Sequence, residues 1–425
     1  MTTAYPKYVA ANSQWLDTVP AHWQVGRLDR VARAWPSNVD KHSVEGEPPV
    51  RLCNYTDVYK NAAIVEDLDF MAATASPEQI ERFRIAVGDT LLTKDSETAD
   101  DIGVPAYVEY EAPDLICGYH LSIVRPNPEV VEPKFLYWAL GAVPTTGQWA
   151  VLASGVTRVG IRAGDLARAA LALPPLDEQC AIAKYLDREV AHIDTLIEEQ
   201  QRLIEMLRER RRSVASDLLG GRVGKGMRLK WHFDELDHRA GGEAERLPLM
   251  SVSISWGVRR RDEAIQDESR AEDLSNYKVC RRGDLVINRM RAFQGALGLA
   301  QEDGVVSPDY AVIRARSEVD REWLAAVMKS DAFVSEMKQR VKGIGSTDLG
   351  NARTPRINIR DLGEIRVDLP DVELQVKEVS QLHTQTVKID TLLAETKRFI
   401  DLALERRAAL ITAAVTGQID VREMA

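Results

Sequence analysis

Two long stretches of the chain repeat apolar side chains at alternating steps of four and three residues. The first stretch runs from Leu186 to Leu218 and the second from Leu382 to Ala414. This spacing is typical of the a and d positions of a coiled coil, so each stretch predicts one helix of roughly 40 residues, about 60 Å long. The apolar seam is predicted to contain Leu186, Val190, Ile193, Ile197, Ile204, Leu207, Leu382, Ile389, Leu393, Ile400 and Leu410.

The two helical stretches are copies of each other. Residues 192–196 read HIDTL and residues 388–392 read KIDTL, while the ERR at 209–211 recurs at 405–407. Both pairs are offset by 196 residues, and a constant offset over more than forty positions indicates a duplicated module. We expect the two helices to pack together as a coiled coil; the alternative is that each packs on its own domain. Parallel and antiparallel pairing both satisfy this pattern.

Each predicted helix has boundary signals and polar interruptions. Prolines precede both helices, so Asp177 and Asp371 are expected to cap them, and glycines follow both. A polar residue on a seam fixes register and partner at some cost in stability. The matching polar positions of the two seams are Gln200 and Thr396, and Arg211 and Arg407, and the terminating glycines are Gly220, Gly221 and Gly417.

The stretches outside the helices share an order of elements but little sequence. Each has a strand that follows Gly-Asp, an alternating strand that ends in Arg, a helical stretch with aromatic residues, and a loop of small residues. This mixture predicts two α/β (α+β) domains separated by two long helices, with a pseudo-two-fold internal repeat. We expect domains at 1–172 and 222–368, and helical segments at 173–221 and 369–425.

Composition excludes several classes of protein. The four cysteines form no CxxC pair and the histidines lack metal-ligand spacing, which disfavours zinc or redox chemistry. No apolar run is long enough for a signal peptide or a membrane span, so we expect a cytoplasmic protein. The net charge of −10 argues weakly against simple nucleic-acid binding.

Local charge points the other way. The segment from 338 to 360 contains six basic residues and one acidic residue, and arginine clusters occur near 260 and 290. Loops rich in Gly, Ser and Thr can approach phosphates closely, and arginine suits phosphate and guanine. The alternative for each arginine is an ordinary surface residue. The candidate DNA-binding residues are Lys94, Thr157, Arg158, Arg162, Arg259, Arg260, Asn288, Arg289, Arg291, Ser346, Thr347, Arg353 and Arg356.

Three features together resemble the specificity subunit of type I restriction–modification systems. Residues 15–28 (WLDTVPAHWQVGRL) resemble the opening of that family, and residues 173–179 (LPPLDEQ) resemble its conserved helix start. The third feature is the repeat of this region 196 residues later. The second copy, residues 369–375 (LPDVELQ), departs from the pattern because it lacks one proline and the Glu-Gln pair.

The resemblance implies a non-catalytic subunit with two target-recognition domains, each of which reads one half of a split sequence in double-stranded DNA. It implies that the paired helices set the spacer between the halves and dock two methyltransferase subunits, and that two restriction subunits complete the complex. It also implies that the N-terminal segment closes the structure near the end of the second helix. No cofactor is expected on this chain, whereas S-adenosylmethionine, ATP and Mg are expected in the partner subunits, which methylate adenine N6 and cleave DNA.

The sequence offers only poor candidates for chemistry of its own. The prolines at 174 and 175 lack the Asn or Asp and the aromatic residue of a methyltransferase loop, and the glycine-rich stretch 220–226 is too short for a P-loop. A nuclease-like Pro308-Asp309 with Glu336 and Lys338 places its second part in a predicted helix. The alternative function is a protein-interaction scaffold built on a dimerising coiled coil.

Overall fold

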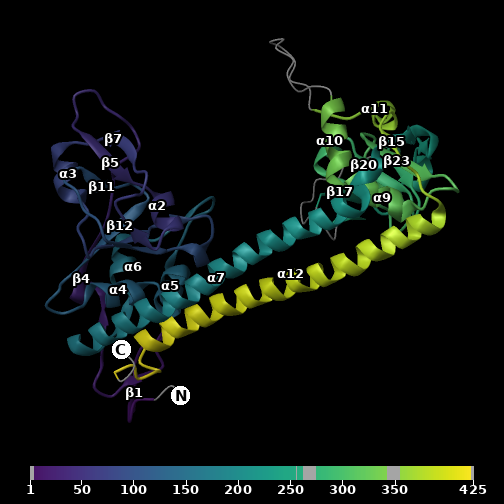
Figure 1. Ribbon diagram of the computed structural model, residues 1–425. Helices are drawn as coiled ribbons and strands as arrows, with labels where there is room; N and C mark the ends of the chain where they lie inside the picture. Colours follow the sequence, from purple (N-terminus) through teal and green to yellow (C-terminus); the bar gives the residue numbers. More distant parts are fainter. Residues whose placement is uncertain (1–3, 255, 262–273, 342–354, 423–425) are drawn as a thin grey trace. The chain divides into compact units, whose positions relative to one another are not determined.

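The computed structural model shows a chain built from two compact units (Figure 1). The described residues are 4–254, 256–261, 274–341 and 355–422. One unit combines Met1–Glu199 with Phe399–Ala425, and the other is Gln200–Arg398. Because the division falls inside both long helices, each unit holds one β-rich head and half of each helix.

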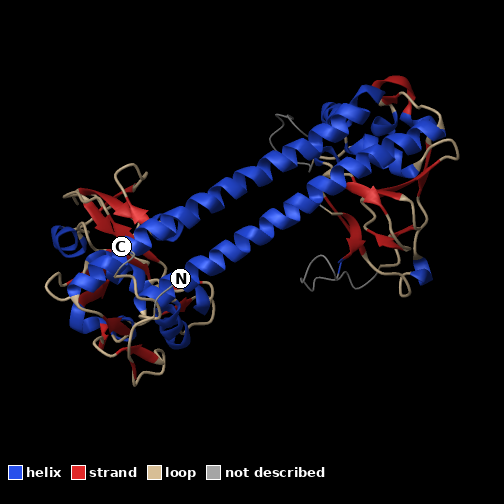
Figure 2. Cartoon of the chain, turned by 60° about the horizontal axis from the view of Figure 1, so that its bottom comes forward, coloured by secondary structure: helices blue, strands red, loops and turns tan. Residues whose placement is uncertain are grey.

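The two long helices are the dominant elements. Helix α7 spans Leu176–Leu219 and helix α12 spans Val372–Val415, with 44 residues each. Figure 2 shows that the strands belong to the heads, whereas the long helices are uninterrupted. This mixed α/β chain with two long helices confirms the predicted fold class.

The head of the first unit is built on a five-stranded sheet of order β4-β12-β8-β10-β6 and a three-stranded sheet of order β11-β5-β7. Its strands are β1 Tyr8–Ala10, β2 Thr18–Pro20, β3 Gln24–Arg27, β4 Ala32–Pro36, β5 Pro49–Cys53, β6 Ala63–Ile64, β7 Met71–Thr74, β8 Thr90–Thr93, β9 Asp95–Ser96, β10 Pro105–Val108, β11 Leu115–Cys117, β12 Leu121–Pro126, β13 Val159–Gly160 and β14 Ala170–Leu173. Its helices are α1 Leu28–Val31, α2 Tyr55–Lys60, α3 Pro77–Phe83, α4 Pro133–Leu140, α5 Val143–Leu152 and α6 Ala163–Ala167.

The head of the second unit is built on a four-stranded antiparallel sheet of order β16-β23-β20-β21. Its strands are β15 Val223–Arg228, β16 Phe233–Leu236, β17 Met250–Ser253, β18 Gly257–Arg260, β19 Lys278–Cys280, β20 Leu285–Asn288, β21 Leu297–Leu299, β22 Gly304–Val306, β23 Tyr310–Ala315 and β24 Arg366–Val367. Its helices are α9 Arg321–Lys329, α10 Asp331–Arg340 and α11 Ile359–Gly363.

Both heads share a buried carboxylate that ties their two central strands together. Asp89 precedes β8 and accepts Nε of Arg125 at 2.8 Å, and Asp284 precedes β20 and accepts Nε of Arg314 at 2.7 Å. The two aspartates are 1% and 2% exposed. Each also accepts a backbone N–H three residues earlier at 2.8 Å. The Gly-Asp and terminal-Arg pattern of the sequence therefore marks one framework, used twice.

The long helices run antiparallel within each unit. In the first unit Arg407 of α12 donates to Asp194 of α7 at 2.8 Å, and in the second unit Arg211 of α7 donates to Asp390 of α12 at 2.8 Å. The two ion pairs are equivalent, because Asp390 lies 196 residues after Asp194 and Arg407 lies 196 residues after Arg211. Exposed ion pairs contribute little stability, under about 1 kcal/mol, so their effect is to set register.

The apolar seam supplies the contact between the helices. Leu186 and Val190 share a buried cluster with Ile411 and Ala414 in the first unit, and Leu218 and Leu382 each pack against the core of the second unit. Every apolar seam position of the sequence analysis is buried or half-buried. Burial of this kind stabilises by about 25 cal/mol per Å² of apolar surface, far more than the ion pairs can.

The helix boundaries follow the sequence signals with one exception. Asp371 accepts the N–H of Leu374 at 2.8 Å and caps α12, and Gly417 adopts φ +74° just after its end. The expected cap at Asp177 is wrong, because α7 begins at Leu176 and Asp177 lies in its first turn. The helix therefore begins two residues earlier than a cap at Asp177 would place it, directly after the two prolines.

A buried glutamine fastens each head to its long helix. Gln179 accepts the N–H of Glu132 at 2.8 Å and donates to the carbonyl oxygens of Pro174 and Val130 at 2.8 and 3.3 Å. Gln375 accepts the N–H of Asp320 at 2.7 Å. It donates to the carbonyl oxygens of Pro370 and Glu318 at 2.8 and 3.1 Å. The second copy has therefore lost only the glutamate of the Glu-Gln pair, contrary to our expectation, since Gln375 makes every contact of Gln179.

The glutamate of the first copy contacts two segments that the second unit does not contain. Glu178 is 4% exposed. Its Oε1 accepts a hydrogen bond from the Tyr5 hydroxyl at 2.5 Å, its Oε2 accepts one from the Trp23 indole N–H at 3.1 Å, and Nε2 of His22 lies 2.8 Å from Oε2. Arg422 of the C-terminal segment lies 3.7 Å from the same carboxylate. The second unit, Gln200–Arg398, contains neither of these segments, and its equivalent position is the exposed Leu374.

The glutamine contacts generate a stability prediction. Gln375→Ala leaves two carbonyl oxygens and one N–H without their partner, which should cost about 2–3 kcal/mol. We expect faster hydrogen exchange of the α9 amides in this variant. The control is Gln201→Ala, which removes an exposed side chain of α7 and should change stability by less than about 0.5 kcal/mol. Unchanged protection of α9 in Gln375→Ala would contradict the proposed contribution of these bonds.

Candidate nucleic-acid interface

In both heads a long loop returns to the sheet at the same place. The N–H of Ile161 donates to the carbonyl of Lys94 at 3.0 Å, and the N–H of Ile357 donates to the carbonyl of Arg289 at 3.0 Å. Lys94 and Arg289 are the residues directly after β8 and β20. We call this end of each central sheet, where the loop joins it, the loop end of the head.

The candidate residues of the first head gather at its loop end. Lys94 donates to the carbonyl of Ser37 at 3.0 Å, and burial lowers the pKa of this lysine. Thr157 and Arg158 are exposed on the loop, and Arg162 is exposed just after its return. Arg158 is paired with Asp95 at 2.9 Å. Four residues chosen from sequence therefore lie on one connected stretch of this head.

Aromatic side chains surround these residues and were missed by the sequence analysis. Tyr55 and Tyr59 of α2 stack with ring centroids 5.4 Å apart, and Tyr119 lies 4.1 Å from Nζ of Lys94. His120 bonds to Asp95 at 2.8 Å and makes edge contacts with Tyr55 and Tyr119. The HLSIVR strand pattern pointed to a strand at this place, but no spacing in the sequence connected it with Tyr55, some 65 residues earlier.

The loop end of the second head is built from different side chains. Asn288 donates to the Tyr310 hydroxyl at 3.3 Å. Burial raises the pKa of Tyr310, and the positive charges of Arg291 and Arg261 act against this rise. Arg289 is used internally, because its guanidinium donates to the carbonyl of Ile357 at 3.1 Å and to Asn358 at 2.9 Å.

The remaining candidate residues differ in exposure and in hydrogen bonding. Arg259 is exposed on β18, whereas Arg260 forms two hydrogen bonds to Glu302, at 2.7 and 2.5 Å. Arg356 is exposed next to Ile357 at the loop end. Three candidates, Ser346, Thr347 and Arg353, lie outside the described residues.

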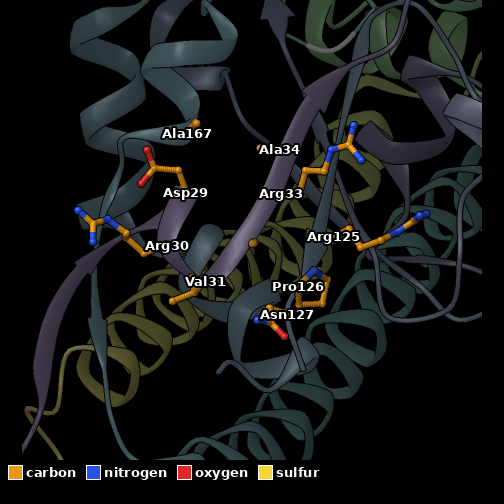
Figure 3. A pocket seen from close by; sticks show the side chains of 10 residues that line it. Asp29, Arg30, Val31, Arg33, Ala34, Arg125, Pro126, Asn127 and Ala167 are labelled. Atoms are coloured by element: carbon orange, nitrogen blue, oxygen red, sulfur yellow. The ribbon is translucent and has the colours of Figure 1, made fainter. Parts of the chain in front are cut away.

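The opposite end of the first head carries a hollow of about 540 Å³ lined by arginines. Figure 3 shows Arg30 pointing to one side of it and Arg33 and Arg125 to the other, so these cations do not converge on one point. Arg125 is already neutralised by Asp89, and the Arg33 guanidinium lies 4.8 Å from the centre of the Trp35 ring. This hollow therefore lacks the geometry of a site for a single anion.

Two further features bear on chemistry. Within the described ranges, no group of three His, Cys, Asp or Glu side chains is placed to hold a metal ion. Glu336 of the nuclease-like pattern lies in α10 and is paired with Arg340 at 2.5 Å. Among the described helices, none combines the length and hydropathy that crossing a membrane requires.

The comparisons with known proteins agree with this architecture. The chain is 23% identical to the type I restriction enzyme MjaX specificity subunit named in Methanocaldococcus jannaschii, over 95% of both chains. It is 22% identical to the EcoDI specificity subunit of Escherichia coli, over 60% of this chain and 64% of that one. No family model matches.

Solved structures have the same fold. The HsdS subunit of Thermoanaerobacter tengcongensis matches with a TM-score of 0.52 at 18% identity, covering 94% of this chain and 98% of that one. A chain from a study of assembly of the type I restriction–modification system matches with a TM-score of 0.63 at 18% identity, covering 94% and 99%. The chain is therefore similar in sequence to two type I specificity subunits and shares the fold of these two solved structures.

The two heads of this chain differ from each other mainly at their loop ends. The carboxylate–arginine framework, the loop return and the glutamine contacts recur in both heads. The side chains at the loop ends do not recur. The first head has tyrosines, His120 and Arg158 there, whereas the second head has Asn288, Tyr310 and arginines. A shared frame with different exposed chemistry is suited to two different ligands of one class.

The second loop end generates a prediction about salt dependence. Arg261→Ala with Arg291→Ala should weaken binding of the assembled complex to non-specific duplex DNA and reduce the slope of log K against log salt by about one per lost phosphate contact. Arg353→Ala with Arg356→Ala is expected to act in the same way. The control is Arg316→Ala, which follows the other end of β23 and is paired with Asp234 at 2.8 Å. Binding titrations at several salt concentrations that give one slope for all variants would rule out these contacts.

Proposed function

We propose that this chain selects the DNA target of a type I restriction–modification complex. The first domain, 1–172, reads one half of a bipartite, asymmetric sequence, and the second domain, 222–368, reads the other. The helical segments 173–221 and 369–425 fix the unread spacer and dock two methyltransferase subunits. Two restriction subunits complete the complex, which works in the cytoplasm.

One observation carries this proposal: the same frame presents different side chains at equivalent places. The loop joins the sheet through Ile161 and Lys94 in one head and through Ile357 and Arg289 in the other. Phosphate contacts fix orientation on DNA, whereas contacts to base edges carry sequence information. Two heads of one construction with unlike loop ends match a target whose two halves have unlike sequences.

The chemistry of the complex is assigned to the partners. In this proposal the chain is non-catalytic and confers specificity, while the methyltransferase subunits use S-adenosylmethionine to methylate adenine N6. The restriction subunits use ATP and Mg for translocation and cleavage. The alternative, a protein-interaction scaffold, requires no DNA contact at either loop end.

Sequencing of methylated bases in the host tests the proposal directly. Deletion of the gene should remove one bipartite adenine-methylation motif from the host genome, and restoring the gene should restore that motif. We also expect a reading frame with a methyltransferase NPPY signature next to this gene. If no bipartite motif disappears in a host that retains the methyltransferase, the scaffold alternative is favoured.

The antiparallel register allows a test of the spacer. The same number of residues separates Asp194 from Arg211 and Asp390 from Arg407, and the two ion pairs join these helices crosswise. Inserting one heptad in both helices, after Arg202 and after Arg398, keeps the seam in phase and preserves both pairs. Seven residues add about 10.5 Å, so we expect the spacer of the methylated motif to lengthen by up to about three base pairs.

The matched control is the insertion in α7 alone. It leaves the helices unequal, so the two ion pairs cannot form together, and we expect methylation to be lost rather than redirected. Motif sequencing distinguishes the outcomes. A normal spacer in the double insertion would show that the helices do not set this distance.

A further inference from the structure

The loop end of the first head contains an arginine held in an unusual way for a surface residue. Nη2 of Arg158 donates to Oδ1 of Asp95 at 2.9 Å, and its guanidinium carbon lies 5.7 Å from the centre of the Tyr55 ring. The Arg158 side chain nevertheless keeps 47% of its surface exposed. The ion pair with Asp95 uses one of the five N–H groups of this guanidinium, and other N–H groups can donate to a ligand.

Asp95, the partner of Arg158, is itself held in place by neighbouring residues. Asp95 is only 17% exposed, and His120 bonds to the same carboxylate at 2.8 Å. Asp95 belongs to β9, which pairs with β13 through Gly160, so the strand that follows Arg158 is fastened to the strand that holds its partner. The carboxylate is therefore fixed from two sides before any ligand arrives.

The loop that carries Arg158 has a backbone constraint of its own. Ser154 and Gly160 exchange backbone hydrogen bonds at 3.1 and 3.0 Å, which closes the loop into a short hairpin. Gly155 adopts φ +153°, and a Cβ there would lie 1.8 Å from the carbonyl oxygen of Arg158. Val156 is fully exposed at the tip. The hairpin thus projects from the head with Arg158 at its base, beside Asp95.

A carboxylate beside an arginine favours some ligands over others. Asp95 would oppose the approach of a phosphate to Arg158, because its carboxylate already offsets the positive charge of that arginine. A base edge has no net charge, so the same carboxylate holds the guanidinium in place without repelling it. The guanine edge in the major groove offers two acceptors, O6 and N7, which match the fork of arginine.

We propose, on the basis of the proposed function, that Arg158 positioned by Asp95 reads a guanine in the half-site contacted by the first head. The contact with the Tyr55 ring and the bond to Asp95 restrict the Arg158 side chain before binding, so little conformational freedom is lost when it meets the base. Asp95 acts as the positioning residue and Arg158 as the residue that contacts the base.

The second head does not repeat this arrangement. The residue equivalent to Lys94 there is Arg289, whose guanidinium is bonded to the carbonyl of Ile357 and to Asn358. The position after it is Met290, where the first head has Asp95. Among the described residues of the second head, the pair of Asp95 and Arg158 thus has no counterpart.

Methylation motifs of single variants test this inference in the complete complex. In hosts that carry Arg158→Ala as the only specificity gene, one G position in one half of the motif should become degenerate, with discrimination reduced about ten- to hundredfold. The other half should be unchanged. Asp95→Asn should relax the same position to a smaller extent. Arg168→Ala is the control, because this exposed arginine is paired with Asp165 after α6 and should leave the motif intact.

A chemical substitution in the DNA identifies the contacted atom. Replacing single guanines of the target with 7-deazaguanine removes the N7 acceptor without changing base pairing. At one position this replacement should weaken binding of the wild-type complex about tenfold and should have little further effect on the Arg158→Ala complex.

The possible results separate the inference from the proposed function. If Arg158→Ala leaves every position of the motif unchanged, the inference fails and the proposed function stands. If Arg158→Ala weakens binding equally for all sequences and lowers the salt slope by about one, Arg158 contacts a phosphate and the inference also fails. If the wild-type gene yields no bipartite motif at all, the proposed function fails and the inference falls with it.

Discussion

The attachment of each head to its helix depends on one buried glutamine. Gln179 and Gln375 use both the carbonyl and the amide group of their side chains, and all of their partners are backbone atoms of the turn before the long helix or of the segment before α4 or α9. Backbone partners leave little room for movement, since the chain on both sides is already committed to a helix or a strand. The side chains at the loop ends can therefore change without altering the contacts that attach each head to α7 or α12.

Much of the fold could be predicted from the sequence because its strongest signals are periodic. The 196-residue offset and the a/d spacing located both long helices, and the Gly-Asp and terminal-Arg patterns located the central strands of both heads. The direction of the helix pair could not be predicted, because apolar spacing is the same in both directions. The direction follows from Arg211 and Arg407, whose partners Asp390 and Asp194 become recognisable only when the helices lie side by side.

The candidate site was less predictable than the fold. Basic residues on the loops were found by composition, but the tyrosines and His120 were not, since Tyr55, Tyr119 and Arg158 come from three separate parts of the chain. Charge counting also cannot distinguish an available arginine from an occupied one. Arg260 and Arg289 have the same composition signal as Arg291, yet the structure uses the first two for bonds to Glu302 and to the chain near Ile357.

The meeting of the chain ends at Glu178 has a consequence for biosynthesis. The core of the first unit includes Leu16 and Trp23 near the start of the chain and Ile411 and Val421 near its end. The ribosome therefore releases the earliest-made head long before the residues that complete its core exist, whereas Gln200–Arg398 is contiguous and can finish while translation continues. The part that is synthesised first is the last to become fully folded, and it must stay soluble while its apolar surface waits for the final helical turns.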